Sequence, residues 1–267
     1  VRADRDSNGR TDLTAWRQET ASWGRVVLKD PGGAETGYLL PGSASGASVN
    51  GYFDGYGSSL GRFEAGRWLL IRPDGSLVVR YWGQEGDVPV AADYNGDGRD
   101  DLAVWRPADS MWWILLENAG QQAEVKVLPW GEPGDIPVPE DYDGDGAADI
   151  AVFRPKTGTW YVVLSHGAVI TASLNLPGLL PVPGDYFGEG RAAPAAWQGS
   201  GGLWYIGGGG SHRISVEQWG LAQDAPLRGD FNGDGVRSLA CGARATGAFI
   251  CARSTVCFLK HGQYSLG

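Results

Sequence analysis

The chain has no long apolar segment: no run in its 267 residues approaches the roughly 18 consecutive apolar residues that a membrane-spanning helix needs. Its first residues, Val1 to Asp4, lack the apolar region of a signal peptide, so we expect an exported form to have lost its signal already. It also lacks an excess of basic residues, with 22 Lys and Arg against 31 Asp and Glu. Because phosphate backbones are held by clustered Lys and Arg, this balance argues against nucleic acid as a partner.

Cysteine is scarce, and the three cysteines all lie near the C-terminal end. An odd number permits one disulfide with one thiol left over. When the chain is aligned on the repeat described below, Cys241 and Cys251 fall on two paired strands of one hairpin. We therefore predict a disulfide between Cys241 and Cys251, with Cys257 free.

Glycine is abundant, with 43 residues, and 15 prolines are spread along the chain. This density of turn residues argues against long helices and favours many short strands joined by tight turns. Hydrophobic residues make up 42% of the chain and 12 residues are Trp, so the composition of a disordered segment is absent. The sequence thus predicts a folded all-β protein.

A long internal repeat sets the architecture. The pattern Trp-Gly-x-x-Gly-Asp-x-Pro-Val begins at Trp82 and again at Trp130, and each copy leads into an acidic loop, at Asp93 and Asp141. The first position of this loop recurs at intervals of 41 to 48 residues, at Asp4, Tyr52, Asp93, Asp141, Asp185 and Asp230. Six units of this length account for the whole chain.

Each unit contains a short strand before the acidic loop and three longer strands after it. In the fourth unit the longer strands are expected at Asp149–Arg154, Thr159–Ser165 and Val169–Leu176. Four strands in about 45 residues are typical of a propeller blade, whose flat sheet buries its faces against neighbouring blades. We predict a six-bladed β-propeller of four-stranded antiparallel blades, a single domain of residues 1–267 with blades starting near residues 1, 50, 91, 139, 183 and 228.

The acidic loop has the spacing of an oxygen-ligand site. Asp141, Asp143, Asp145 and Asp149 occupy positions 1, 3, 5 and 9, and the position-7 carbonyl of Ala147 can join them. Alternate side chains of a tightly turned loop converge on one point, and hard oxygen ligands suit Ca²⁺. The pattern recurs in three further loops, formed by Asp4, Asp6, Asn8, Arg10 and Asp12; by Asp93, Asn95, Asp97, Arg99 and Asp101; and, less completely, by Asp230, Asn232, Asp234, Val236 and Ser238.

Two loops have lost the pattern and are expected to bind no ion. They read Tyr52, Asp54, Tyr56 and Leu60 in the second unit, and Asp185, Phe187, Glu189 and Ala193 in the fifth. We therefore predict three to four Ca²⁺ ions, and four would change the formal charge from −9 to −1. An EF-hand is excluded because its position-12 Glu is replaced by Val104 or Val152. Solvated Asp/Asn-Gly turns without an ion are the remaining alternative.

These loops, with the preceding Trp-Gly…Gly-Asp-x-Pro-Val segment, resemble the FG-GAP/VCBS-like repeats, which are related to the calcium-loop propeller of integrin α subunits. The resemblance covers essentially the whole chain. It implies a propeller with Ca²⁺ in the hairpin between the first and second strands of a blade. Proteins with such repeats are commonly extracellular adhesins, lectins or accessory domains of secreted enzymes. The resemblance thus implies a secreted or cell-surface location, either alone or within a longer chain.

Eleven of the twelve tryptophans occupy repeated slots, which indicates packing between blades. These are Trp23, Trp68, Trp112, Trp160 and Trp204 on the third strand, where Phe249 completes the set; Trp16, Trp105 and Trp197 on the second; and Trp82, Trp130 and Trp219 after the fourth. A lectin built from repeats would also repeat its aromatic site. Sugar binding between blades therefore stays open.

Residues that break the repeat are the candidates for binding a ligand: Glu140, Trp113, His166 and His212. The expected function is a non-catalytic, calcium-stabilised extracellular module that binds carbohydrate or protein. The alternative is a secreted carbohydrate-active enzyme, or the accessory domain of one, that uses the channel mouth with Glu140 and a second carboxylate as acid and base.

Overall fold

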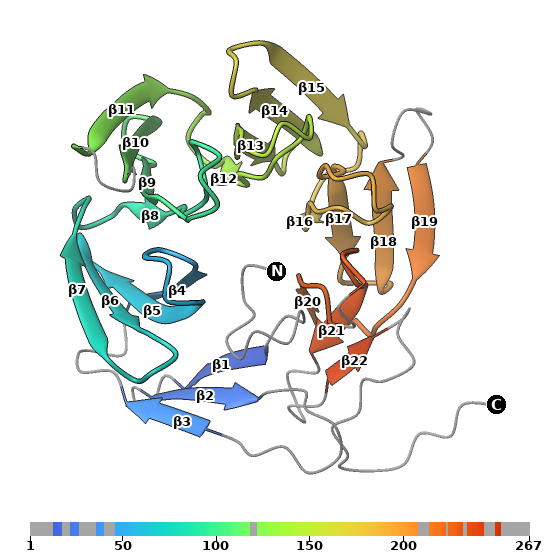
Figure 1. The fold of residues 1–267 in the computed structure, drawn as a ribbon. Helices are drawn as coiled ribbons and strands as arrows, with labels where there is room; N and C mark the ends of the chain where they lie inside the picture. Colours follow the sequence, from blue (N-terminus) through green and yellow to red (C-terminus); the bar gives the residue numbers. More distant parts are fainter. Residues whose placement is uncertain are drawn as a thin grey trace.

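The computed structural model describes residues 46–117, 122–207, 214–222, 224–231 and 234–241 in full, and the backbone alone of residues 13–17, 22–26, 36–39, 242 and 249–251. The regular structure of these residues is all β, in six antiparallel sheets around a common axis (Figure 1). Nowhere in these ranges is there a helix of the length and apolarity that a membrane crossing requires. We number the sheets 1 to 6 in chain order, and each acidic loop takes the number of its sheet.

Four of the sheets are complete four-stranded propeller blades, and in each the chain runs from the innermost strand to the outermost (Figure 1). The strands of these blades are β4 (Ala47–Gly51), β5 (Ser59–Glu64), β6 (Arg67–Ile71) and β7 (Leu77–Tyr81) in sheet 2; β8 (Val88–Pro89), β9 (Leu102–Arg106), β10 (Met111–Leu116) and β11 (Glu124–Pro129) in sheet 3; β12 (Ile136–Pro137), β13 (Ile150–Arg154), β14 (Thr159–Val163) and β15 (Val169–Ser173) in sheet 4; and β16 (Leu180–Pro181), β17 (Ala195–Gln198), β18 (Leu203–Gly207) and β19 (Ile214–Gln218) in sheet 5.

The prediction of six four-stranded blades is corrected to four. Sheet 1 consists of β1 (Leu13–Arg17), β2 (Ser22–Val26) and β3 (Thr36–Leu39), and sheet 6 of β20 (Ala225–Leu227), β21 (Ala240–Gly242) and β22 (Phe249–Cys251). The repeat would put the missing strand of sheet 1 before β1 and that of sheet 6 after β22. Both positions lie outside the described residues, so these two sheets have three strands each in the part of the chain that the structure covers.

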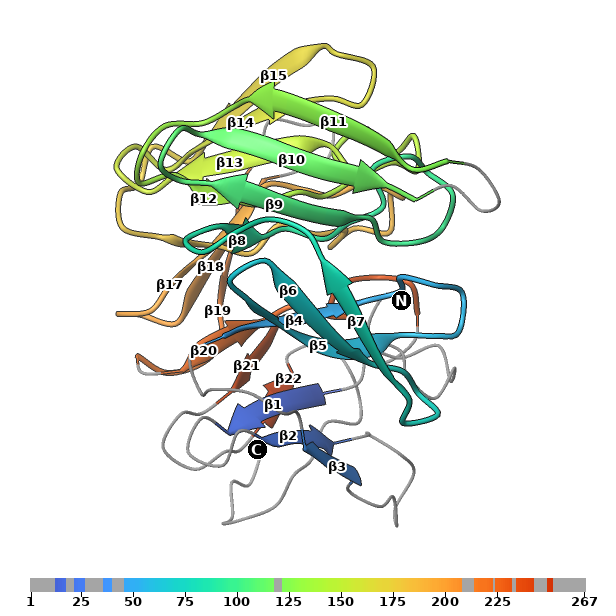
Figure 2. The same ribbon diagram turned by 90° about the vertical axis from the view of Figure 1, so that its left-hand side faces the viewer.

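The hydrophobic core lies between neighbouring sheets and not within any one of them. Outer strands such as β7, β11 and β15 are largely exposed, and β7 and β11 face the viewer in Figure 2. The cluster between sheets 4 and 5 combines Phe153 and Trp160 of one sheet with Ala192 and Ala196 of the next. Since a flat blade buries its faces only against its neighbours, this arrangement explains why the apolar slots repeat.

The repeated tryptophans are structural in the described sheets. The third-strand members Trp68, Trp112, Trp160 and Trp204 are 0% exposed. The indole N–H groups of three of them, Trp68, Trp112 and Trp204, donate to the backbone carbonyls of Trp82, Trp130 and Trp219 at 2.9 to 3.1 Å. Each of these bonds ties the third strand of a blade to the end of its fourth strand. The prediction of a packing role is confirmed for these positions.

The predicted disulfide between Cys241 and Cys251 is wrong, because Cys241 is a free cysteine. The pairing of β21 with β22 sets Cys241 opposite Ile250, and Cys251 opposite Ala240. The register that a disulfide between these two residues would need is therefore absent, because each cysteine lies opposite a different residue. Cys257 lies outside the described residues.

We expect the thiol of Cys241 to be unreactive in the native protein. It is fully buried and donates to the carbonyl of Trp219 at 3.7 Å. Burial raises the pKa of Cys241 to about 12, and the negative charge of Asp224 acts in the same direction. Because the thiolate is the reactive form, iodoacetamide should label Cys241 only after denaturation. Peptide mass mapping checks this, and a disulfide-linked peptide containing Cys241 would contradict it.

Candidate functional site

Loop 4 (141–149) connects β12 to β13, and its backbone is folded around the carboxylate of Asp141. The N–H groups of Gly144 and Gly146 donate to the two oxygens of that carboxylate at 2.6 and 2.9 Å. Both glycines have positive φ angles, 86° and 92°, which glycine adopts without steric cost. A bridge between Glu140 and Asp149 closes the base of the loop. The sequence thus holds Asp141 in place through the glycines that follow it.

Three carboxylates of loop 4 gather at one point. Ligand oxygens of Asp141, Asp143 and Asp149 all lie within 4.8 Å of one another. Asp149 is fully buried and accepts hydrogen bonds from the N–H groups of Tyr142 at 2.8 Å and Ser165 at 2.7 Å. Burial raises the pKa of Asp149 to about 6, and the negative charges of Asp143 and Asp141 add to the effect. Loop 4 therefore concentrates negative charge in a site partly shielded from water.

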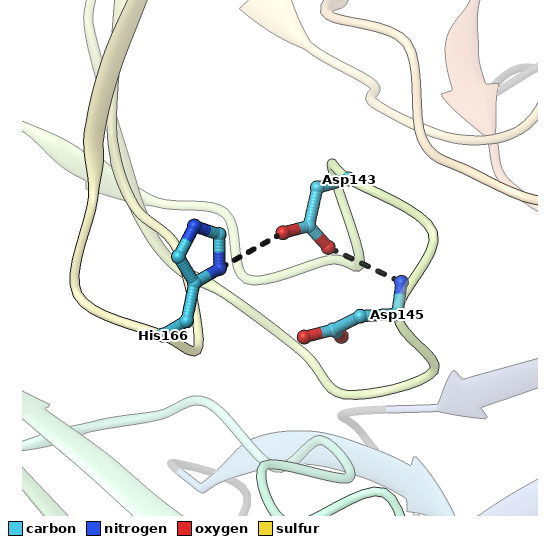
Figure 3. A group of neighbouring side chains, drawn as sticks. All are labelled: Asp143, Asp145 and His166. Carbon is cyan, nitrogen blue, oxygen red and sulfur yellow. Dashed lines mark hydrogen bonds and ion pairs between the residues drawn. The ribbon is translucent and has the colours of Figure 1, made fainter.

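His166 lies beside this loop and not at a separate site. Its Nδ1 is 3.3 Å from Oδ2 of Asp143, and with Asp143 and Asp145 it forms a second group of closely spaced ligand atoms (Figure 3). Asp145 accepts hydrogen bonds from the Ser165 hydroxyl and the Ala147 N–H, and both lower the pKa of Asp145. His212, the corresponding candidate in the next sheet, lies outside the described residues.

Loop 3 (93–101) repeats this geometry. The carboxylate of Asp93 accepts the N–H groups of Gly96, Asp97 and Gly98. Asp101 is buried and accepts from the N–H groups of Tyr94 and Glu117, both at 2.9 Å. Burial raises the pKa of Asp101 to about 6, with Asp93 and Asp97 adding negative charge. Position 3 is Asn95, so loop 3 has three carboxylates at positions 1, 3, 5 and 9, where loop 4 has four.

The other two predicted ion loops are covered incompletely. Asp4, Asp6, Asn8, Arg10, Asp12 and Asn232 lie outside the described residues. In loop 6, Asp230 accepts the N–H of Gly235 at 2.9 Å, and Asp234 accepts that of Val236. Ser238 accepts the N–H of Phe231 at 3.4 Å, in the way that Asp101 and Asp149 accept from their tyrosines. The described residues of loop 6 thus keep three of the hydrogen bonds of loops 3 and 4, with a neutral residue at position 9.

Acidic residues of loops 2 and 5 have arginine partners that the sequence analysis did not predict. Asp54 pairs with Arg72, whose guanidinium also lies 4.7 Å from the centre of the Tyr56 ring. Glu189 pairs with Arg191 at 3.0 Å. Arg191 could have been found from its place two residues after Glu189, whereas nothing local links Arg72 to Asp54. In contrast, no Lys or Arg among the described residues forms an ion pair with the carboxylates at the predicted ligand positions of loops 3 and 4, which are Asp93, Asp97, Asp101, Asp141, Asp143, Asp145 and Asp149.

Neighbouring loops are joined by a repeated hydrogen bond. In loops 3 to 6, the N–H at position 8 donates to the carbonyl at position 1 of the preceding loop, as from Ala148 to Asp93 and from Ala192 to Asp141, both at 2.6 Å. Asp100 and Arg237 make the same bond, to Tyr52 and Asp185. Position 1 therefore has two functions, since its side chain organises its own loop while its carbonyl holds the next sheet.

Glu140 forms an ion pair that connects sheets 4 and 6. Both of its carboxylate oxygens lie 3.4 Å from Nη2 of Arg237, and one lies 3.9 Å from Nη1 of Arg228. The Arg237 side chain passes over sheet 5 at Gly184, where an added Cβ would lie only 2.7 Å from Arg237 Cγ. The absence of a side chain at Gly184 is thus what lets the two charges meet.

We expect this ion pair to contribute about 1 kcal/mol to stability or less, because both groups are partly exposed. Glu140→Gln and Arg237→Gln should each destabilise slightly, and the double variant should cost less than the sum of the two. Gly184→Ala should cause a similar small destabilisation, because the added Cβ would displace the Arg237 side chain from Glu140. Urea denaturation of all four variants measures the coupling. Strict additivity of Glu140→Gln and Arg237→Gln would contradict the pairing.

Trp113 breaks the repeat in residue type but not in its contacts. It is partly buried, its ring centre lies 5.1 Å from the Arg106 guanidinium carbon, and its carbonyl accepts the indole N–H of Trp82. Tyr161 has the same contacts with Arg154, at 4.5 Å, and with Trp130. Trp113 also packs against the cluster between sheets 2 and 3. Its surroundings thus indicate a structural role like that of Tyr161.

The comparisons with known proteins agree with this architecture. Residues 93–152, which include loops 3 and 4, match the FG-GAP-like repeat family. Among curated protein sequences, none matches the chain significantly.

Several solved structures share the fold at low sequence identity. An Agrocybe aegerita lectin that recognises non-reducing terminal N-acetylglucosamine is similar with a TM-score of 0.59 and 14% identity, over 88% of this chain and 72% of the lectin. Virginiamycin B lyase from Staphylococcus aureus has a TM-score of 0.56 and 10% identity, over 96% and 88%. BBS1N, in complex with ARL6DN, has a TM-score of 0.55 and 12% identity, over 90% and 86%. At these identities the similarity concerns the fold alone.

Proposed function

Because the chain is a β-propeller that carries an FG-GAP-like repeat, we propose that it is a non-catalytic binding module, stabilised by Ca²⁺, in a secreted or cell-surface protein. Its proposed ligand is a carbohydrate or an extracellular protein. The observation that carries the proposal is the cluster of Asp141, Asp143 and Asp149, whose ligand oxygens lie within 4.8 Å of one another without a Lys or Arg partner among the described residues.

The residues present fit Ca²⁺. The donors of loops 3 and 4 are carboxylate, amide and backbone carbonyl oxygens, which are the ligands that Ca²⁺ prefers. In loop 4 they are Asp141, Asp143, Asp145, Asp149 and the carbonyl of Ala147, and in loop 3 Asp93, Asn95, Asp97, Asp101 and the carbonyl of Arg99. A bound ion supplies two positive charges that offset the repulsion among these groups. Extracellular modules typically bind Ca²⁺ at the concentrations found outside cells.

Ion binding in these loops would also support the contact between sheets. Asp141 contributes its carboxylate to the cluster and its carbonyl to the bond with Ala192 of sheet 5. Asp93 does the same toward Ala148, which lies between two proposed ligands of loop 4. An ion that fixes the position of Asp141 would therefore stabilise the contact between sheets 4 and 5, and an ion that fixes Asp93 would stabilise the contact between sheets 3 and 4. Loops 2 and 5 need no ion in this proposal. Arg72 pairs with Asp54 of loop 2, and Arg191 pairs with Glu189 of loop 5, which leaves Asp185 as the one carboxylate of loop 5 without an arginine partner among the described residues.

A catalytic role for Glu140 finds no support in its surroundings. Its described ion-pair partners are Arg237 and Arg228, and both of its carboxylate oxygens lie 3.4 Å from Nη2 of Arg237. A catalytic acid or base must instead exchange a proton with the substrate at hydrogen-bond distance. The pairing of Glu140 with two arginines instead suits a fixed structural charge, so we propose no enzymatic activity.

A glycan array, run in millimolar CaCl₂ and again in excess chelator, tests the proposal. We expect one class of glycan to bind in CaCl₂, and binding to weaken in chelator at temperatures where the apoprotein begins to unfold. The bound glycan should be recovered intact. Release of new reducing ends would contradict the non-catalytic assignment, and a complete absence of glycan binding would reject the carbohydrate half of the proposal.

A further inference from the structure

A small cavity opens between sheets 4 and 5, beside loop 5. Its volume is about 170 Å³. The residues that shape its mouth and walls are Ile170 and Ala172 of β15, Phe187, Glu189 and Arg191 of loop 5, and Pro194. A cavity of about 150 Å³ in a protein core accommodates benzene, so this one has room for a single six-membered ring.

The cavity exists where the repeat is broken. Phe187 occupies position 3 of its loop, where loops 3 and 4 carry Asn95 and Asp143. Ile170 lies opposite Val162 in sheet 4, whereas the equivalent pair in sheet 3 is Lys126 with Ile114. Phe187 and Ile170 are both 42% exposed. The interface between sheets 4 and 5 thus presents an apolar surface where the preceding interface carries polar and charged residues.

The polar groups at this cavity form a matched donor and acceptor. Both Nε and Nη2 of Arg191 donate to Oε2 of Glu189, at 3.1 and 3.0 Å. Among the described residues, Oε1 of Glu189 and Nη1 of Arg191 have no hydrogen-bond partner, so one acceptor and one donor remain side by side. The two charges offset each other, which disfavours a ligand with net charge. Adjacent hydroxyl groups, which both donate and accept, match this pair.

We infer that the cavity between sheets 4 and 5 binds one pyranose ring of a neutral glycan. Phe187 packs against the apolar face of the ring, and Glu189 and Arg191 bond to two adjacent hydroxyl groups. This inference rests on the proposed function, since it names the cavity in which the proposed carbohydrate ligand binds. An aromatic ring packed against a sugar and a few placed polar groups are the usual means of recognition in such pockets.

The test uses a glycan array to identify the preferred terminal sugar, followed by calorimetric titration of the methyl glycoside of that sugar. We expect Phe187→Ala and Glu189→Gln to weaken binding at least tenfold. Ala172→Leu should do the same by filling the cavity while removing no polar group. Tyr56→Ala is the matched control, because Tyr56 is an exposed aromatic residue in loop 2, away from this cavity. Thermal unfolding of each variant verifies that it is folded.

The outcomes separate the site from the function. If the wild type binds the glycoside and the three cavity variants bind it equally well, the cavity is not the site, although the carbohydrate function stands. If no glycan binds the wild type, the carbohydrate function and this site are both rejected. Loss of binding in Tyr56→Ala but not in Phe187→Ala would move the site to loop 2 and overturn the inference.

Discussion

We expect removal of Ca²⁺ with excess chelator to lower the unfolding temperature of the protein by several degrees or more. Without the ion, the carboxylates of Asp141, Asp143 and Asp149 repel one another in a partly buried loop. An ion present at 100 to 1,000 times its dissociation constant contributes roughly 2 to 4 kcal/mol per site. For a domain of this size each kcal/mol corresponds to roughly 2 to 4 °C. Differential scanning calorimetry with and without chelator measures the change.

A pair of matched variants assigns the effect to the loops. Asp141→Asn removes one ligand charge from loop 4 and should reduce the stabilisation by added CaCl₂. Asp185 occupies the same position in loop 5 and accepts four backbone N–H groups, so Asp185→Asn perturbs a similar loop. We expect its CaCl₂-dependent stabilisation to equal that of the wild type. Identical melting curves of the wild type in CaCl₂ and in chelator would refute the calcium proposal.

The number of ions provides an independent check. We expect native mass spectrometry to detect three bound ions and a fourth that is lost more readily. We assign the three to the loops that begin at Asp4, Asp93 and Asp141, and the fourth to the loop at Asp230, where position 9 is Ser238. Loops 2 and 5 should bind none, because Arg72 and Arg191 already pair with Asp54 and Glu189. Six bound ions would show that these two loops are also ion sites.

Trp160→Ala should destabilise the protein by about 3 to 5 kcal/mol, the usual cost of removing a buried aromatic side chain. Trp160 is 0% exposed, and its ring centre lies 4.4 Å from that of Phe153 in the core between sheets 4 and 5. Equilibrium unfolding in guanidinium chloride measures the loss. Tyr81→Ala is the control. Tyr81 is an aromatic residue at the end of β7 and is 75% exposed, so its removal should change stability little.

The same variant also tests whether the repeated tryptophans bind a ligand. If Trp160→Ala abolishes glycan binding while the free energy of unfolding stays within about 1 kcal/mol of the wild type, the slot is a binding site and the packing assignment is wrong. A large loss of stability supports the packing role that the buried indole indicates.

The sequence alone determined the features that are local and repeated. Unit length, strand positions and the ligand spacing of the acidic loops all recur within one unit of about 45 residues. The slots of Trp112, Trp160 and Trp204 could therefore be aligned without a structure, and they are buried in the same way. A repeat specifies such features because every unit must form the same sheet and pack against the same kind of neighbour.

Only the tertiary structure decided the contacts that do not repeat. Glu140 meets Arg237 across 97 positions, and it can do so because Gly184 leaves space between them. Cys241 lies opposite Ile250 and not opposite Cys251, because the register of one strand pair is offset by a single residue. Neither feature has a sequence period, because Glu140, Arg237 and the two cysteines stand at positions where the other units carry different residues. The cavity at Phe187 has the same origin, because it requires two different neighbouring sheets and no pattern within either one predicts it.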